Sequence, residues 1–184
     1  MKINYYIFDL DGTLCDSMGL WRRETAHIDD FRDRELMESA YERMREHYRT
    51  DIQLKPGVWE YLEDARANGI KMCIATGTRR DVAEPFLERT GLMKFMEFFI
   101  DCHEVRRFKE HPDIYLLAAE RLGAAIPECA VFEDAKYSAE TAKRAGFRVV
   151  GIIDEVTSTE GDVREFADIA VKDWRELSCL YSTT

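Results

Sequence analysis

The alternation of short apolar runs with helical patterns is the feature that most limits the fold of this chain. Six runs rich in β-branched and aromatic residues are each bounded by polar residues or glycine: 3–10, 70–76, 97–102, 129–134, 148–153 and 168–171. Helical patterns that begin at proline or end at glycine separate them, at 56–69, 79–91, 112–123 and 135–146. This alternation predicts right-handed βαβ units, and therefore an α/β fold with a parallel sheet and helices on both faces.

Residues 17–54 break the alternation and predict two helices instead. The first helix, capped by Asp16 or Ser17, has Met18, Trp21, Thr25 and Ile28 on one face. The second has a stripe formed by Met37, Tyr41, Met44 and Tyr48. We interpret residues 17–54 as a short helical cap inserted into a core domain made of residues 1–16 and 55–184. The stripe is interpreted mainly as packing within the cap, and an exposed part of it permits a dimer contact.

Length and charge exclude several classes of protein. A chain of 184 residues that is 46% hydrophobic is long enough for one core domain with a small appendage. The net charge of −10 argues against a general nucleic-acid binder, which needs a basic face. No apolar run is long enough to span a membrane or to act as a leader, and the five scattered cysteines contain no CxxC pair. We therefore expect a soluble, cytoplasmic protein with reduced thiols and no membrane partner.

Polar residues stand where the predicted strands end. Ligands of parallel sheets bind at the carboxyl ends of the strands, near the point where strand order reverses. Residues from four separate segments are predicted to meet at this edge: Asp9, Asp11, Thr76, Lys109, Glu133 and Asp134. The site is thus expected to combine several acids with a hydroxyl and an ammonium group.

This combination favours magnesium and phosphate chemistry. Two neighbouring carboxylates such as Asp9 and Asp11 repel each other unless a cation lies between them. Mg²⁺ binds a few carboxylates, keeps some waters and completes its shell with substrate phosphate. Lys109 and Thr76 are suited to the phosphate oxygens, and the turn at Gly12 and Thr13 is expected to add backbone N–H donors.

The segment "DLDGT", followed in order by Thr76, Lys109 and the pair Glu133-Asp134, resembles the haloacid dehalogenase-like phosphohydrolase superfamily. The similarity covers nearly the whole chain and is strongest to the beta-phosphoglucomutase and phosphoglycolate phosphatase branch. It implies a Rossmann-like core with a helical cap. It also implies that Asp9 is the nucleophile that forms an aspartyl-phosphate, and that Asp11 is the general acid and base. Asp9, the backbone carbonyl of Asp11, and Asp134 are implied Mg²⁺ ligands, with Glu133 at or near the metal.

The chain departs from the family pattern in three places. Glu110 follows the motif lysine where proline is frequent, so Arg106 or Arg107 is an alternative phosphate cation. Gly77 stands where the family often has Ser or Asn, and only its backbone N–H can bind phosphate there. The cap of residues 17–54 is also shorter than is usual in this branch, which predicts a more open site.

These features together predict a Mg²⁺-dependent phosphatase that acts on a small phosphorylated metabolite such as a sugar phosphate. A phosphomutase of the beta-phosphoglucomutase type shares every core residue and stays an alternative, as does a non-catalytic binding protein with the same fold. A phosphonate hydrolase is disfavoured because no lysine lies between Lys2 and Lys55. A dehalogenase would need neither Asp11 nor Asp134. The physiological substrate and the choice between monomer and homodimer stay open.

Overall fold

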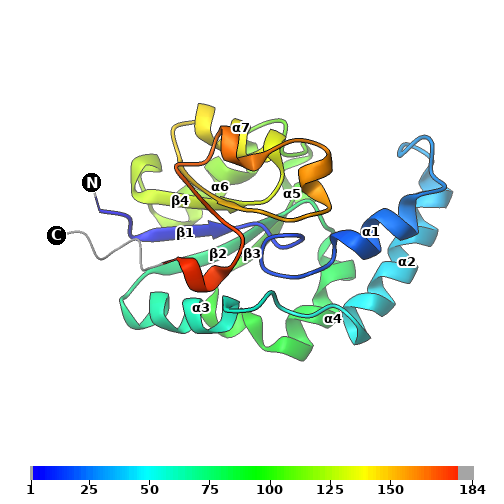
Figure 1. Cartoon of the computed structure of the whole chain (residues 1–184), viewed down its shortest axis with the longest axis horizontal. Coiled ribbons are helices and arrows are strands. Elements are labelled where there is room, and N and C mark those ends of the chain that lie inside the picture. The colour runs from blue at the N-terminus through cyan, green and yellow to red at the C-terminus, as the bar shows by residue number, and fades with distance from the viewer. Residues whose placement is uncertain (1, 178–184) are drawn as a thin grey trace.

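The fold is an α/β sandwich built on a single parallel sheet (Figure 1). The structure, a computed structural model, describes residues 2–177. Six parallel strands lie in the order β3-β2-β1-β4-β5-β6. Their bounds are β1 Tyr5–Phe8, β2 Lys71–Thr76, β3 Phe99–Asp101, β4 Cys129–Glu133, β5 Arg148–Ile152 and β6 Ile169–Val171. Each predicted strand is present, and the predicted fold class is confirmed.

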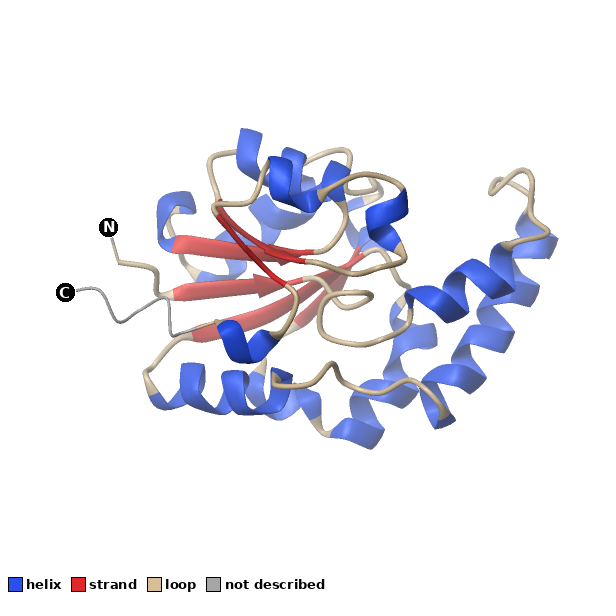
Figure 2. Ribbon diagram, in the orientation of Figure 1, coloured by secondary structure: helices blue, strands red, loops and turns tan. Residues whose placement is uncertain are grey.

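Helices cover both faces of the sheet (Figure 2). One face carries α5 (Cys102–Val105), α6 (Asp113–Leu122) and α7 (Lys136–Arg144), and the other carries α3 (Val58–Ala67) and α4 (Arg80–Thr90). The four helices predicted between the strands are confirmed. Sequence patterns missed the short helix α5 and five 3-10 turns, which are Leu92–Phe95, Ile126–Glu128, Thr157–Thr159, Val163–Glu165 and Trp174–Glu176.

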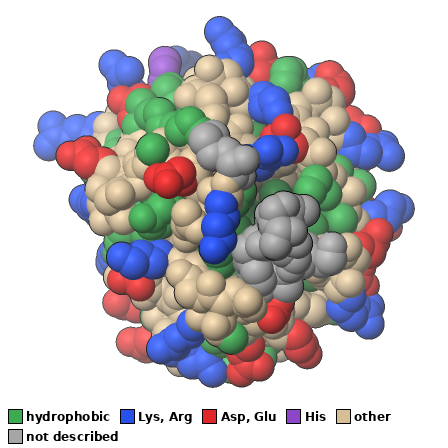
Figure 3. Space-filling view, turned by 90° about the vertical axis from the view of Figure 1, so that its left-hand side faces the viewer, with side chains coloured by type: hydrophobic (Ala, Val, Ile, Leu, Met, Phe, Trp, Pro, Cys, Tyr) green, Lys and Arg blue, Asp and Glu red, His purple; other side chains and the backbone are tan. Residues whose placement is uncertain are grey.

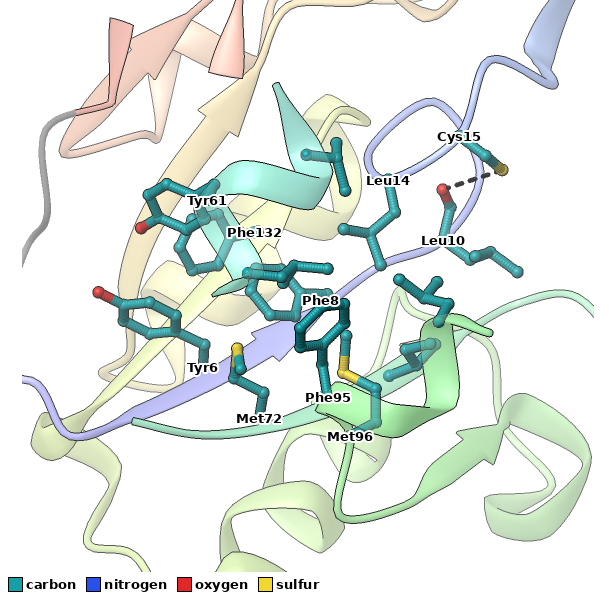
Figure 4. Close-up of a cluster of buried hydrophobic side chains, with 14 of the residues drawn as sticks. Tyr6, Phe8, Leu10, Leu14, Cys15, Tyr61, Met72, Phe95, Met96 and Phe132 are labelled. Carbon is teal, nitrogen blue, oxygen red and sulfur yellow. Dashed lines mark hydrogen bonds between the residues drawn. The ribbon is translucent and has the colours of Figure 1, made fainter. Parts of the chain in front are cut away.

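The core consists of two apolar layers because alternate strand residues point to opposite faces of the sheet. Tyr6 and Phe8 of β1 pack on the α3 side, whereas Ile7 packs on the α6 side. Phe132 of β4 lies against Phe8 on the α3 side, as Figure 4 shows. Trp174 stacks on Phe132 with ring centroids 5.5 Å apart, and its indole N–H donates to the carbonyl of Thr13. The carboxyl-terminal segment therefore fixes the loop that follows β1.

The predicted helical pair is present as α1 (Met18–Thr25) and α2 (Arg34–Thr50), which we call the hairpin together with their connecting loop. The hairpin projects from the end of the sheet toward which the strands run, and α2 packs against α4. Ala40, Met44 and Tyr48 are the buried residues of α2. Ile28 is buried but lies beyond the end of α1. Ser17 occupies the N-cap position of α1, as one of the two predicted capping residues, but its side chain makes no capping hydrogen bond.

The strand order reverses beside β1, which places the ends of β1 and β4 next to each other at the reversal point. The opposite end of the molecule displays basic and acidic side chains intermixed over its surface (Figure 3). Within residues 2–177, no helix is long and apolar enough to cross a membrane. Cys15, Cys73, Cys102 and Cys129 are free and buried, and Cys179 lies outside the described residues.

Candidate active site

A cavity of about 400 Å³ lies between the carboxyl ends of the strands and the hairpin. Its floor consists of residues at or just beyond the carboxyl ends of β1, β2 and β4, together with residues that precede α6. All the residues predicted for the site line this one cavity: Asp9, Asp11, Thr76, Gly77, Lys109, Glu133 and Asp134. The parallel topology brings them together because it directs the end of every strand to the same edge.

A buried ion-pair network stands at the centre of the floor. Lys109 is only 4% exposed, and its ammonium group bonds Asp9 Oδ1 as well as Glu133 Oε1 at 2.6 Å. The hydroxyl of Tyr115 donates to the same Glu133 oxygen at 2.6 Å. Burial opposes the charged form of Lys109, but the two adjacent carboxylates hold its pKa well above the usual value. Lys109 is therefore a charged, fixed group.

Three acidic side chains of the floor lie close enough together to bind one cation. One oxygen atom from each of Asp9, Glu133 and Asp134 lies within 4.8 Å of the others. Asp134 Oδ2 is buried and, within the described chain, has no hydrogen-bond partner. Burial raises the pKa of Asp9 well above its usual value, and burial followed by the adjacent Glu133 raises the pKa of Asp134 to about 7. These residues fit a hard divalent cation, which would favour the charged carboxylates and engage the orphaned oxygen.

The turn after β1 lies very close to this acid cluster. Gly12 has φ +78°, and a Cβ atom at this position would collide with the carboxylate of Asp134. Thr13 Oγ1 donates to the other carboxylate oxygen, Oδ1, at 3.1 Å. The N–H of Gly12 donates to the carbonyl of Cys15 at 3.0 Å, so the expectation that this N–H is a phosphate donor is wrong. The glycine instead permits a close approach of the turn to Asp134.

Asp11 has a different environment from Asp9, because its carboxylate is tied to the hairpin. Ser17 Oγ donates to Asp11 Oδ1 at 2.6 Å, and the Tyr48 hydroxyl donates to the same oxygen. The indole N–H of Trp21 lies 3.3 Å from that oxygen and 3.0 Å from the Tyr48 oxygen. Thr78 Oγ1 donates to the second oxygen, Asp11 Oδ2, at 2.7 Å. The two aspartates one residue apart are therefore held by separate sets of partners.

Thr78 and Tyr48 are site residues that the sequence reasoning missed. Thr76 Oγ1 accepts a hydrogen bond from the N–H of Thr78 at 3.1 Å, which fixes the turn after β2 and directs the Thr78 side chain into the cavity. A second hydroxyl two residues after Thr76 was the available signal for Thr78. Tyr48 carried no such signal, because its place in an apolar helical stripe indicates packing.

The structure brings Lys109 to the cavity, and not the two arginines considered as its alternatives. Arg106, at φ 55°, ends α5, and Arg107 lies 3.6 Å from Asp113 at the start of α6. Neither arginine lines the cavity. The ion pairs of Lys109 also make its position firm despite the unusual Glu110 that follows it.

One known protein family matches most of this chain. A family model for haloacid dehalogenase-like hydrolases matches residues 19–146. The chain belongs to this family. The match covers nearly all of the hairpin, the strands β2, β3 and β4, and the helix α7. It includes Thr76, Lys109, Glu133 and Asp134, whereas β1 with Asp9 and Asp11 precedes it.

Individual relatives include a phosphatase and solved structures with the same fold. The phosphorylated carbohydrates phosphatase of Thermotoga maritima is 37% identical over 103 residues, which are 55% of this chain and 48% of the relative. Two solved structures share the fold. CbbY from Rhodobacter sphaeroides in complex with phosphate has a TM-score of 0.81, 24% identity and 96% coverage of both chains. Beta-phosphoglucomutase from Clostridium difficile has a TM-score of 0.74, 21% identity, and coverage of 97% of this chain and 95% of its own. This haloacid dehalogenase-like chain spans about half the length of the first curated relatives that it matches.

We expect Tyr48→Phe to lower kcat of this haloacid dehalogenase-like protein about tenfold, with KM changed less than twofold. The variant removes one donor to Asp11 but keeps the buried ring, so it alters the orientation of the carboxylate rather than the packing of α2. Steady-state kinetics on a phosphomonoester measures both constants. Tyr5→Phe, at the start of β1, is the matched control and should leave both unchanged; an equal loss in the two variants would contradict a positioning role for Tyr48.

Proposed function

We propose that the protein is a Mg²⁺-dependent phosphatase that hydrolyses a small phosphomonoester through an aspartyl-phosphate intermediate. The observation that carries the proposal is the charge arrangement of the cavity floor. Four carboxyl groups there face one buried ammonium group: Asp9, Asp11, Glu133 and Asp134 against Lys109. A cation and a phosphate together complement this arrangement, because the cation balances the acids and the phosphate accepts from Lys109.

In the first step, a carboxylate oxygen of Asp9 attacks phosphorus, and the bond from phosphorus to the leaving oxygen breaks. We assign the attack to Oδ2, since Oδ1 is the oxygen that bonds Lys109. Asp11 gives its proton to the leaving alcohol. Lys109 and the turn of Thr76 to Thr78 would then hold the phosphoryl oxygens, over which charge spreads in the transition state.

In the second step, Asp11 takes a proton from a water molecule, and the oxygen of that water attacks the phosphorus of the aspartyl-phosphate. The bond between phosphorus and the Asp9 oxygen breaks, which releases inorganic phosphate and restores the carboxylate. The separate hydrogen-bond partners of Asp9 and Asp11 support this division of roles, because each carboxyl group is oriented independently.

Asp9, Glu133, Asp134 and the backbone carbonyl of Asp11 are the residues that we propose for the Mg²⁺ site. The bound cation would supply charge neutralisation for the phosphoryl oxygens and for the crowded acids. Gly12 would keep the adjacent turn close to Asp134, as its positive φ allows.

We further propose that residues 17–54, which contain the hairpin, form a cap over a core made of residues 1–16 and 55–184. The hairpin contributes Met18, Trp21 and Tyr41 to the cavity that also contains the acids. A cap in this place limits the access of water and contacts the leaving group. Because the hairpin is short, we favour hydrolysis over the mutase reaction, in which a phosphorylated intermediate must be protected from water.

The test is phosphate release from a panel of phosphomonoesters, measured with Mg²⁺ and after chelation. We expect release with Mg²⁺, a loss of at least about 100-fold in chelator, and recovery when Mg²⁺ is returned. Conversion of a sugar phosphate into its isomer without free phosphate would favour the mutase. Normal Mg²⁺ binding with turnover of no ester would instead indicate a binding protein.

A further inference from the structure

The cavity has two chemically different halves. Within the described chain, the charged side chains that line it belong to the floor described above. The wall opposite the floor belongs to the hairpin and presents apolar and aromatic side chains, chiefly Met18, Trp21, Phe31, Met37 and Tyr41. The cavity therefore combines a phosphate-sized polar end with an extended apolar wall.

Aromatic side chains also gather at the rim of this cavity. Phe31, Phe108 and Tyr137 are 64%, 63% and 49% exposed, and all three line it. They come from three separate segments, namely the connecting loop of the hairpin, the loop before α6, and α7. Only Leu36, Leu116 and Ile169 are comparably exposed large apolar residues in the range 2–177. A concentration of exposed aromatic groups around one concave site indicates a ligand that covers them.

The polar atoms that Thr25 and Trp21 contribute to the wall are engaged within the protein. Thr25 Oγ1 donates to the carbonyl of Trp21 at 2.8 Å, and the indole N–H of Trp21 is used by Asp11 and Tyr48. The nearby guanidinium of Arg79 lies 4.8 Å from the ring centroid of Tyr41 and pairs with acidic side chains. Apart from the hydroxyl of Tyr41, this wall offers few polar partners, so the several hydroxyls of a sugar would lose water there without equivalent replacement, which disfavours binding.

We infer that the preferred substrate is a phosphomonoester whose alcohol portion is apolar or aromatic rather than a sugar. The inference rests on the proposed function for the phosphate end of the ligand. The alcohol portion would lie against Met37 and Tyr41 of α2, with Phe31 and Phe108 closing over it from the rim. The volume of about 400 Å³ is sufficient for a ring of this kind beside the phosphate.

The first test compares 2-phenylethyl phosphate with ribose 5-phosphate. Both are esters of primary alcohols, so their leaving groups are similar and the comparison reports on recognition. We expect kcat/KM for the aromatic ester to exceed that for the sugar phosphate at least tenfold. Equal values, or a preference for the sugar phosphate, would overturn the inference.

The second test removes the aromatic rim in the double variant Phe31→Ser/Phe108→Ser. Both side chains are exposed, so their replacement leaves the core intact. The variant should lose about tenfold in kcat/KM for 2-phenylethyl phosphate and less than twofold for ribose 5-phosphate. Leu116→Ser is the matched control, because Leu116 is an exposed apolar residue of α6 outside the cavity. It should leave unchanged the ratio of kcat/KM for 2-phenylethyl phosphate to kcat/KM for ribose 5-phosphate. An unchanged ratio in the double variant also counts against the inference.

Binding separates the inference from the proposed function. Titration calorimetry with Asp9→Asn measures the affinity of both esters without turnover. Tighter binding of 2-phenylethyl phosphate, together with a wild type that hydrolyses no ester of the panel, would refute the phosphatase proposal and support the apolar specificity. Tighter binding of ribose 5-phosphate would refute the apolar specificity whatever the wild type hydrolyses.

Discussion

Asp9→Asn is expected to reduce phosphate release by at least about 10⁴-fold, because an amide cannot attack phosphorus and no other carboxylate occupies its place. Asp9 is buried at the end of β1 and is fixed through Oδ1 by Lys109. The asparagine side chain has nearly the same shape, and Lys109 keeps Glu133 as a partner. The loss should therefore come from chemistry rather than from unfolding. Phosphate release with saturating substrate and Mg²⁺ measures it.

Two further measurements make this prediction specific. Asp16→Asn changes an exposed aspartate in the same loop and should keep activity within twofold of the wild type. Acid quenching of the wild type during turnover, followed by peptide mass spectrometry, should locate one phosphoryl group on the peptide that contains Asp9. A variant that retains a tenth of the activity, or a phosphoryl group found elsewhere, would show that Asp9 is not the nucleophile.

Lys109→Met is expected to have the second largest effect, on stability as well as on activity. Removal of the ammonium group leaves Asp9 and Glu133 buried together without their cation. We expect the free energy of unfolding in chelator to fall by about 3 kcal/mol, which is typical when one partner of a buried ion pair is removed. Activity with Mg²⁺ should fall at least about 100-fold, because the phosphoryl charge loses its ammonium partner. Denaturant unfolding and phosphate release measure the two effects.

Lys143→Met provides the matched control for the stability effect. Lys143 of α7 pairs with Asp168 at 2.6 Å, but its side chain is 41% exposed. An exposed pair of this kind contributes at most about 1 kcal/mol. Mg²⁺ should also stabilise Lys109→Met more than it stabilises the wild type, since it would take over part of the missing positive charge. Equal stability losses in the two lysine variants would mean that the ion pairs of Lys109 do not stabilise the fold.

The elements that follow local rules could be predicted from the sequence. Strands such as β1 and β4 are short runs of almost entirely buried residues, and helices such as α6 begin near proline and end at glycine. Their alternation leaves few possible topologies, so the edge at which Asp9 and Asp134 meet was also predictable. A local rule assigns the Ser17 hydroxyl to the cap of the helix, whereas Asp11 competes for it successfully.

Contacts between residues far apart in the sequence could not be predicted in this way. Tyr48 reaches Asp11 only because α2 folds back over the end of β1, and Trp174 reaches the carbonyl of Thr13 from the far end of the chain. Neither contact has a signature in the local pattern, since a buried aromatic residue satisfies its hydroxyl or N–H wherever the fold provides an acceptor.

The sequence by itself thus determined the α/β architecture and the set of acids at one sheet edge, because periodicity and strand ends are local properties of the chain. Only the tertiary structure decided which partners each acid has. Lys109 pairs with Asp9 and Glu133, whereas the hairpin and Thr78 hold Asp11. Tertiary structure also placed the apolar wall opposite those acids. The physical reason is that hydrogen bonds and apolar contacts depend on distances in space, which packing sets and sequence spacing does not.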